Sequence, residues 1–401
     1  LDAHGNFTPA AHGFAKKAGV DISKLGFQKI GNEECIFLKI NEKGKAASLV
    51  LPELLKELVS SIHLPIAMRW GNLDMQFIRP IHSIICLLDT KVVSLEIAGI
   101  TSGNTTKGHR FLSSKPVVVK SADSYEKDLL AGFVVVDPEE RKAVIEKAIK
   151  AIEKKLSLKA VYEDALLDEV TFINEFPTPV LAEIDEKYLA VPQECLIATM
   201  QKNQKYFPLV DKHGKLSKHF IVIANNATKK SEKNIVTGNV KVVTARLEDA
   251  KFFYEEDLKV KLDTMVEGLK KVTYQEKIGT IYGKIERIVK ISAWLADKLH
   301  LSAEDKKNVN RAAYIAKADL NSKMVYEFPE LQGIMGVYYA KAQGENAVVA
   351  EAVGDHWKPK FAGDNISKIS TVAAIVSIAD KLDSITSCFS AGLIPTSSSD
   401  P

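Results

Sequence analysis

Three side chains in the C-terminal part of the chain have the types and the spread of a metal-dependent phosphohydrolase site: Asp319, His356 and Asp380. Histidines and aspartates carried by several helices can ligate a divalent ion for phosphoester hydrolysis. An adjacent His-Asp pair would complete such a set, but the residue before Asp319 is Ala318, which has no donor atom. We therefore predict no metal here and polar groups that are satisfied within a helical bundle.

A polar loop at residues 101–111 carries three basic side chains, Lys107, His109 and Arg110. Together with backbone amides near its glycines, these side chains could hold a phosphate. The alternative is a tight structural turn that exposes its basic residues. The spacing alone leaves both interpretations open.

Residues 199–208 interleave amide side chains with Lys202 and Lys205 and end in the adjacent rings of Tyr206 and Phe207. This mixture suits RNA, because amides can read base edges, lysines can meet phosphates and rings can stack on bases. The alternative is an amphipathic helix whose two rings belong to the core.

The net charge of +3 is unevenly distributed. Residues 201–300 contain 20 Lys and Arg against 12 Asp and Glu, a local charge of +8, which leaves about −5 for the remainder. A basic segment in a near-neutral chain suggests a polyanion such as nucleic acid, although a lysine-rich solvated surface gives the same count. Arg246 and Lys251 lie in this segment and complete our set of RNA-binding candidates.

An acidic cluster, Glu255-Glu256-Asp257, follows the same stretch. It could bind a metal, or Asp257 could join an ion-pair network with Arg246 and Asp249. No histidine is near, so a solvated helix end is the favoured interpretation. The chain has no G-x-S-x-G, H-E-x-x-H or Rossmann glycine motif, and its four cysteines form no C-x-x-C pair. We predict no catalytic residue.

The elements that must position these residues change character along the chain. Short strand-like and helical stretches alternate up to about residue 250, and Pro138–Leu156 is a strongly amphipathic helix. Phe77–Leu88 reads as a buried segment whose helix or strand state stays open. From Ala245 onward almost every stretch has the apolar periodicity of a helix. The helices predicted there are Arg246–Tyr254, Asp263–Val272, Tyr282–Leu299, Ala303–Asp319, Ala347–His356 and Ile369–Phe389.

Residues 325–339 interrupt this helical pattern. Pro329 fixes its own φ and disfavours a helical Phe328, and Gly333 and Gly336 stand where a core helix would favour alanine. Such a departure from helix propensity indicates a specific packing or binding need.

Eight runs, in this order, resemble the β subunit of the bacterial two-subunit glycyl-tRNA synthetase. They are Met68–Gly71 with Phe77–Pro80, Thr105–Phe111, Thr199–Pro208, Ala245–Tyr254, Glu327–Gly333, Phe361–Asp364, Ala379–Asp383 and Gly392–Thr396.

This resemblance implies a multidomain protein: an N-terminal α+β segment (1–65), a B3/B4-like α+β domain (66–250) and an all-α degenerate HD domain (251–401). In that family the α subunit activates glycine with ATP and Mg, and the β subunit supplies most of the tRNA binding in an α2β2 heterotetramer. The expected partners are the α subunit and tRNA(Gly), with no DNA and no membrane, in the cytoplasm. No cofactor is expected on this chain. The remaining alternatives are an HD-type phosphohydrolase and a pure scaffold for the α subunit.

The chain departs from the family at its end. Members usually read Gly-Ser-Lys-Asp-Pro there, whereas this chain has Ser397-Ser398-Ser399-Asp400-Pro401 and lacks the basic residue. Ala318 is shared with the family's degenerate HD module, so hydrolase chemistry is not implied. We expect the chain to be a fragment that lacks the extreme N-terminus and the body-tail and anticodon-binding regions.

Overall fold

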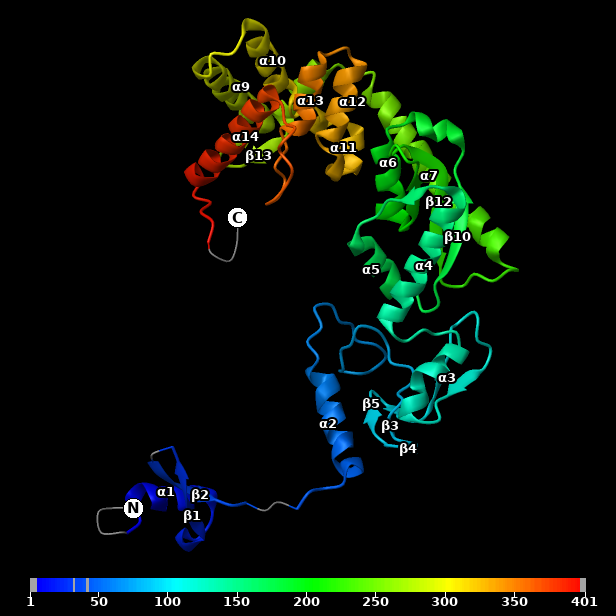
Figure 1. The fold of residues 1–401 in the computed structure, drawn as a ribbon, viewed down its shortest axis with the longest axis vertical. Coiled ribbons are helices and arrows are strands. Elements are labelled where there is room, and N and C mark those ends of the chain that lie inside the picture. Colours follow the sequence, from blue (N-terminus) through cyan, green and yellow to red (C-terminus); the bar gives the residue numbers. More distant parts are fainter. Residues whose placement is uncertain (1–5, 32, 41–42, 397–401) are drawn as a thin grey trace. The chain divides into compact units, whose positions relative to one another are not determined.

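The computed structural model describes residues 6–31, 33–40 and 43–396 (Figure 1). The departure predicted at residues 397–401 lies outside this range. The chain divides into two compact units: Leu1–Lys107 with Pro116–Asp128, and Gly108–Lys115 with Leu129–Pro401.

The first unit consists of small elements with little core. Helix α1 (Pro9–Ala18) begins at Thr8, whose hydroxyl accepts a hydrogen bond from the amide of Ala11, and proline suits its first position. Helix α2 (Ala47–Ser61) has no buried residue. The antiparallel pairs of this unit are β1 (Leu25–Ile30) with β2 (Glu33–Leu38), β3 (Leu87–Leu88) with β4 (Lys91–Val92), β5 (Glu96–Ile97) with β6 (Ile100–Thr101), and β7 (Thr105–Lys107) with β8 (Pro116–Val118). Helix α3 (Tyr125–Ala131) begins in this unit and ends in the second.

The second unit contains an antiparallel four-stranded sheet with helices on both faces. Its strand order is β10 (Thr178–Glu183), β12 (Leu216–Ala224), β11 (Phe207–Val210) and β9 (Lys159–Ala160). Ile221 packs with residues of α4 (Pro138–Leu156) and α5 (Asp164–Ile173), whereas Phe220 and Val222 pack into the core that includes α6 (Gln193–Ala198) and α7 (Glu232–Asp257). The alternation follows from the two-residue period of a strand.

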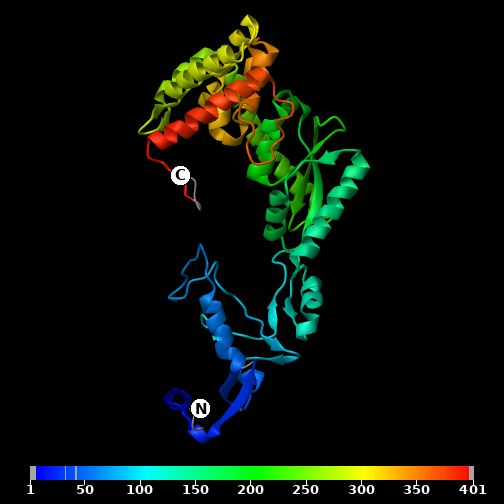
Figure 2. The same cartoon turned by 60° about the vertical axis from the view of Figure 1, so that its left-hand side comes forward.

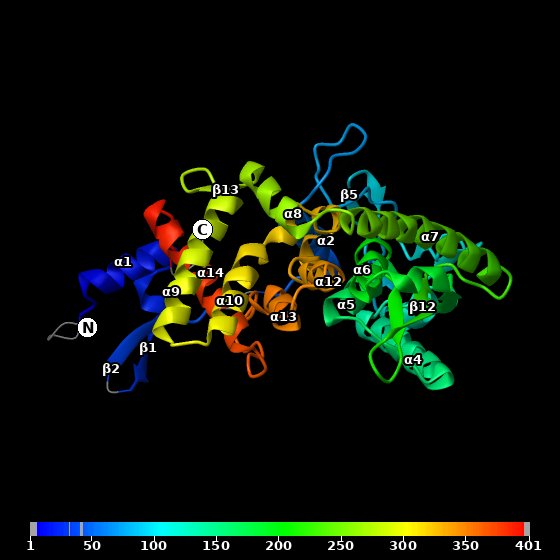
Figure 3. The same cartoon turned by 90° about the horizontal axis from the view of Figure 1, so that it is seen from above.

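The remainder of this unit is helical and shares that same large core, which runs from Ala182 to Ala379. A short hairpin, β13 (Thr273–Gln275) with β14 (Gly279–Thr280), precedes α9 (Ile281–Lys298). Helix α14 (Thr371–Ser390) lies beside α9 and α10 (Ala303–Ile315) (Figures 2 and 3). The helices are α8 (Leu262–Gly268), α9 (Ile281–Lys298), α10 (Ala303–Ile315), α11 (Lys323–Glu327), α12 (Ile334–Ala342), α13 (Ala347–Asp355) and α14 (Thr371–Ser390).

The predicted mixture of α+β and helical parts is confirmed at this level. Helix α7 extends across the predicted boundary at residue 250, and the three-part division stays a prediction. The interpretation of Phe77–Leu88 is wrong, because none of these residues is buried and only the last two form a strand. Helix α10 ends at Ile315, earlier than predicted, and the chain continues into a 3₁₀ helix, Ala318–Asn321.

Among the described residues, no helix is long and apolar enough to cross a membrane.

Candidate functional site

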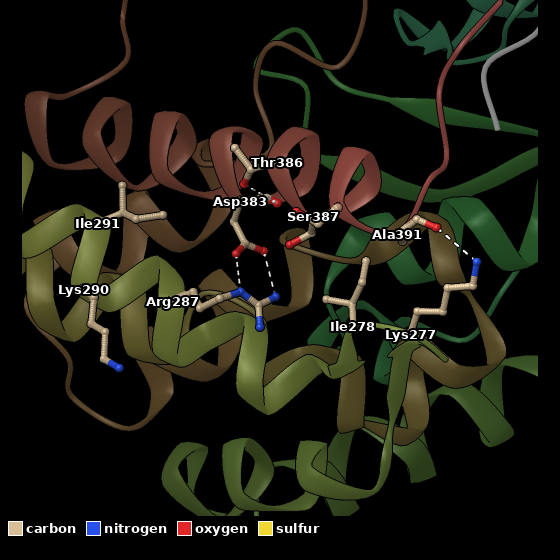
Figure 4. A pocket seen from close by; sticks show the side chains of 10 residues that line it. Lys277, Ile278, Arg287, Lys290, Ile291, Asp383, Thr386, Ser387 and Ala391 are labelled. Carbon is tan, nitrogen blue, oxygen red and sulfur yellow. Dashed lines mark hydrogen bonds and ion pairs between the residues drawn. The ribbon is translucent and has the colours of Figure 1, made fainter.

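Four buried charged side chains and the partly exposed Arg287 form what we call the buried charge cluster of the helical part: Lys284, Arg287, Lys317, Asp380 and Asp383. Helix α9 supplies the first lysine and the arginine, α14 supplies both aspartates, and Lys317 follows the end of α10. The Nζ of Lys317 lies 2.6 Å from Oδ2 of Asp380. Arg287 binds both carboxylate oxygens of Asp383 (Figure 4). The cluster therefore joins three separate segments of the chain.

Lys284 is the central cation of this cluster. Its ammonium group donates to Oδ2 of Asp383 at 3.1 Å, to the hydroxyl of Ser384 at 2.8 Å and to the carbonyl of Asp380 at 3.2 Å. It also lies 2.9 Å from Oδ1 of Asp380, where the distance is that of an ion pair although the angles are not those of a hydrogen bond. All three N–H groups of Lys284 are therefore used.

Burial and charge act against each other in this cluster. Lys317 is 3% exposed, and burial lowers its pKa to about 8 although Asp380 opposes the shift. Burial alone would raise the pKa of Asp380, but Lys317 and Lys284 lower it to about 2. The Nζ of Lys317 also lies 3.4 Å from the ring centroid of Trp357, a cation–π contact. Both members of the Lys317–Asp380 pair are therefore charged at neutral pH.

The four predicted HD positions do not converge on one point. The side chain of Asp319 faces α12, where its Oδ2 accepts hydrogen bonds from the amides of Gly333 at 2.6 Å and Gly336 at 3.0 Å. Burial raises the pKa of Asp319 to about 6. Ala318 is fully buried and contributes no polar side-chain atom.

His356 is the predicted position that lies nearest to Asp380. Its Nε2 is 4.0 Å from Oδ2 of that residue, and its Nδ1 is 2.7 Å from the carbonyl of Val353. Burial, assisted by the charge of Lys317, lowers the pKa of His356 well below its usual value, so the ring is neutral. Within the described ranges, no three His, Cys, Asp or Glu side chains come close enough to form a metal site.

The two glycines of the segment 325–339 allow Asp319 to bind α12. Gly333 has a φ of 80°, and a Cβ there would collide with the ring of Trp357. A Cβ on Gly336 would lie 2.6 Å from Cγ1 of Val353 and 3.2 Å from Oδ2 of Asp319. The expected packing need is therefore the close approach of a carboxylate and an indole ring to the start of α12.

His109 is not available for a phosphate. It is buried, and its Nδ1 accepts hydrogen bonds from the amides of Phe111 and Leu112 at 3.2 Å. This arrangement corresponds to the structural turn that the sequence left open. Arg110 and Lys107 are exposed, and they belong to the second and the first unit respectively.

In the run at 199–208 the aromatic rings are buried and the lysines pair with carboxylates, which is not expected for an open RNA surface. Tyr206 and Phe207 are buried, which agrees with the alternative that places both rings in the core and not with stacking on bases. Neither ring lies on a helix, because Tyr206 precedes β11 and Phe207 begins it. Lys202 pairs with Glu330 at 3.2 Å and Lys205 with Glu169 at 2.8 Å. Both lysines would have to leave or share an acidic partner to bind a phosphate.

Within the described part of the chain, Arg246 forms no ion pair of the kind that the sequence left open. Arg246 is exposed, and Lys251 lies 3.8 Å from Glu255. Asp257 is buried, which corrects the prediction of a solvated helix end. Its carboxylate accepts hydrogen bonds from the amides of Lys323 and Met324, the first residues of α11, at 2.9 and 3.0 Å. An N-terminal helix cap of this kind satisfies two free amides.

The sequence reasoning missed the lysines of the buried charge cluster. Lys284 and Lys317 stand in ordinary helical patterns, where a lysine is expected to face solvent. The only signal was the Asp-Lys-Leu-Asp spacing on α14, since Asp380 and Asp383 are three residues apart and share one helix face.

Comparison with known proteins agrees with the order of the sequence runs. A family model described as glycyl-tRNA synthetase beta subunit matches residues 1–401. Relatives named glycine--tRNA ligase beta subunit from Clostridioides difficile (strain 630) and Syntrophus aciditrophicus (strain SB) are each 44% identical over 401 residues, and one from Bacillus subtilis (strain 168) is 41% identical. All of this chain is covered in each case, but it spans only 58% of the length of these relatives. The chain thus belongs to the glycyl-tRNA synthetase beta subunit family.

Proposed function

We propose that this chain is a non-catalytic, tRNA-binding part of a glycine--tRNA ligase, which supports the attachment of glycine to tRNA(Gly) by an α subunit. The observation that carries the proposal is the family match over all 401 residues. The relatives are named as ligase beta subunits, and ATP and Mg would be used by the α subunit. The protein would work in the cytoplasm as an α2β2 heterotetramer.

The helical part is proposed to be a degenerate HD domain, and the sheet with its helices a B3/B4-like module. In support of the first assignment, His356 and Asp380 lie close together, and Asp319 is buried on the segment that follows α10. The ammonium groups of Lys284 and Lys317 lie against Asp380. Because these cations already neutralise the carboxylate, the arrangement argues against a metal-dependent phosphohydrolase.

Exposed basic residues on the second unit are the candidate RNA contacts. Arg110 and Arg246 are exposed and have no acidic partner within the described part of the chain. Lys202, Lys205 and Lys251 would contribute after exchanging a carboxylate for a phosphate. Lys107 on the first unit completes the set.

The test is binding of tRNA(Gly) to this chain over a salt series, with and without the α subunit. We expect affinity to fall steeply with salt, by about one log unit per log unit of salt for each phosphate contacted. Arg246→Glu should weaken binding, whereas Lys147→Glu, an equal charge change on the exposed side of α4, should not. Binding of the α subunit without any binding of tRNA would favour a pure scaffold instead.

A further inference from the structure

A groove of about 510 Å³ opens between the β13–β14 hairpin, α9 and the C-terminal end of α14 (Figure 4). Its walls carry three cations, one carboxylate and three hydroxyl groups, of which that of Thr386 is already used within α14. The other groups are those of Lys277, Arg287, Lys290, Asp383, Ser387 and Ser390. None of them belongs to the RNA-binding candidates that the sequence motifs suggested.

The single carboxylate of this groove is already neutralised. The side chain of Asp383 is 2% exposed and is bound by both Lys284 and Arg287. Arg287 uses its Nε and Nη2 for this contact, and its side chain is still 36% exposed. The side chain of Arg287 therefore lines the groove while it stays bound to Asp383.

Two lysines at opposite ends of the groove add uncompensated positive charge. Lys277 donates one hydrogen bond to the carbonyl of Ala391 at 3.1 Å, which leaves two of its three N–H groups free. Lys290 on α9 is exposed, and no acidic residue in the described part of the chain pairs with it. The groove therefore has an excess of two positive charges over its carboxylate.

The hydroxyl groups supply neutral donors between these cations. Ser387 and Ser390 are three residues apart on α14, so they share one helix face, and neither hydroxyl has a hydrogen-bond partner among the described residues. Thr386, in contrast, uses its hydroxyl on the carbonyls of Leu382 and Asp383. Free serine hydroxyls beside lysine and arginine side chains are typical partners of phosphate oxygens.

We propose that this groove binds a phosphodiester of an RNA backbone, without reading the base sequence. The inference rests on the proposed function, because it names a surface by which the chain would hold tRNA. Inorganic phosphate shares the same chemistry, so the experiment must separate a free anion from a nucleic acid. A polyanion is favoured because the two lysines lie at opposite ends of an open groove and not around one point.

The test measures tRNA(Gly) binding by the whole chain and by charge-reversal variants. We expect Lys290→Glu and Lys277→Glu each to weaken binding by about tenfold and to reduce the salt slope by about one. Lys290→Arg keeps the charge and should bind within about twofold of the parent. Lys298→Glu, at the far end of α9 and outside the groove, is the matched control and should also stay within about twofold. Circular dichroism and thermal unfolding of each variant exclude a folding defect.

A second measurement separates the two sources of phosphate. Labelling of Lys290 by an amine-reactive reagent should be suppressed by tRNA at micromolar concentration but not by inorganic phosphate at the same concentration. If phosphate protects Lys290 and tRNA does not, the RNA assignment is overturned. If the chain binds tRNA but Lys290→Glu behaves like Lys298→Glu, the groove is overturned and the proposed function stands. Absence of any tRNA binding at low salt would overturn both.

Discussion

The ammonium group of Lys317 lies between a carboxylate and an indole ring, and both contacts favour its charged form. Replacement by methionine keeps the volume, but of the cations in the described part of the chain only Lys284 then still pairs with Asp380. Removing one member of a buried ion pair leaves an uncompensated charge. We expect Lys317→Met to lower the free energy of unfolding by about 3 kcal/mol in urea denaturation.

The exposed Lys307 on α10 provides the control for this experiment. Lys307→Met should change stability by less than about 0.5 kcal/mol. Adding Asp380→Leu to Lys317→Met should recover part of the loss, because both charges are then gone. Equal stability of the two single lysine variants would contradict a structural role for the buried pair.

Asp319 gives the protein a pH dependence with a defined sign. Its pKa in the folded protein is about 6, above its ordinary value of 3.8, so the native state holds this proton more tightly than the unfolded chain. The group therefore contributes stability below about pH 4 and loses it as pH rises through 6, by about 3 kcal/mol for a shift of about two units. In the variant Asp319→Asn, the amide oxygen would still accept both backbone hydrogen bonds, but the side chain could not ionise.

The contribution of Asp319 is separated from all other titrating groups when the free energy of unfolding of the parent is compared with that of Asp319→Asn at each pH. The stability of the parent minus that of Asp319→Asn should fall between pH 4 and pH 7. Urea unfolding at several pH values within that window gives the difference directly. A constant difference would show that Asp319 has the same pKa in both states.

The sequence patterns located Asp319, His356 and Asp380 but not the groups that contact them: backbone amides at Asp319, a carbonyl at His356 and two lysines at Asp380. The alanine at position 318 is the reason why we expect an incomplete ligand set, and that expectation stays a prediction. Lys317 points inward because it contacts Trp357 and Asp380, which are 40 and 63 residues further along the chain. Local patterns carry no information on such distant partners, and a lysine in a helical pattern is more often exposed.

Around the start of α12, Gly333 and Gly336 pack closely against the carboxylate of Asp319 and the ring of Trp357. A methyl group on Gly336 would contact Val353 at 2.6 Å, so Gly336→Ala forces side chains to move. We expect a loss of about 1–3 kcal/mol in stability. The measurement is the midpoint and slope of urea denaturation.

Gly238 is a matched control in α7, where an added Cβ meets nothing within 4 Å. Gly238→Ala should stabilise the protein by about 0.5–1 kcal/mol, because alanine is the better helix former. Val353→Ala should reduce the penalty of Gly336→Ala by removing the contacting methyl groups. If both glycine variants gained stability, close packing at α12 would not be the reason for Gly336.

Elements with a strong local signal agree best with the structure. Helix α4 has the predicted bounds Pro138–Leu156, since Asp137 caps it, proline begins it and its apolar stripe is regular. The end of α10 was missed, because the chain leaves the helix where Lys317 and Asp319 both turn inward. The buried cap of Asp257 on α11 was missed for the same reason, as its partners lie 66 or more residues away.

For the whole molecule, the order of the eight sequence runs said more about the family than any single candidate site did. Each run alone is short and of mixed composition, and several residues of these runs pack in the core and are not exposed. Tyr206, Phe207 and His109 are examples of such buried residues. The family was therefore predictable from the sequence. Which side chains are exposed was not, because this depends on which of them pack into the core.

We expect this chain to replace a full-length relative only in part. It spans 58% of the relatives' length, so we expect it to bring only part of the tRNA contacts. With an α subunit, it should support little glycylation at submicromolar tRNA(Gly) compared with a full-length relative. Missing contacts that act equally on substrate and transition state raise KM and leave kcat unchanged.

Initial rates over a range of tRNA concentrations distinguish the two possible deficits. A raised KM with a retained kcat would mean that the chain positions the tRNA acceptor end correctly but holds it weakly, and lower salt should then restore activity. A reduced kcat at saturating tRNA would mean that parts outside residues 1–401 position the acceptor end. Charging equal to that of a full-length relative at low tRNA would contradict the prediction, because these residues would then suffice for binding.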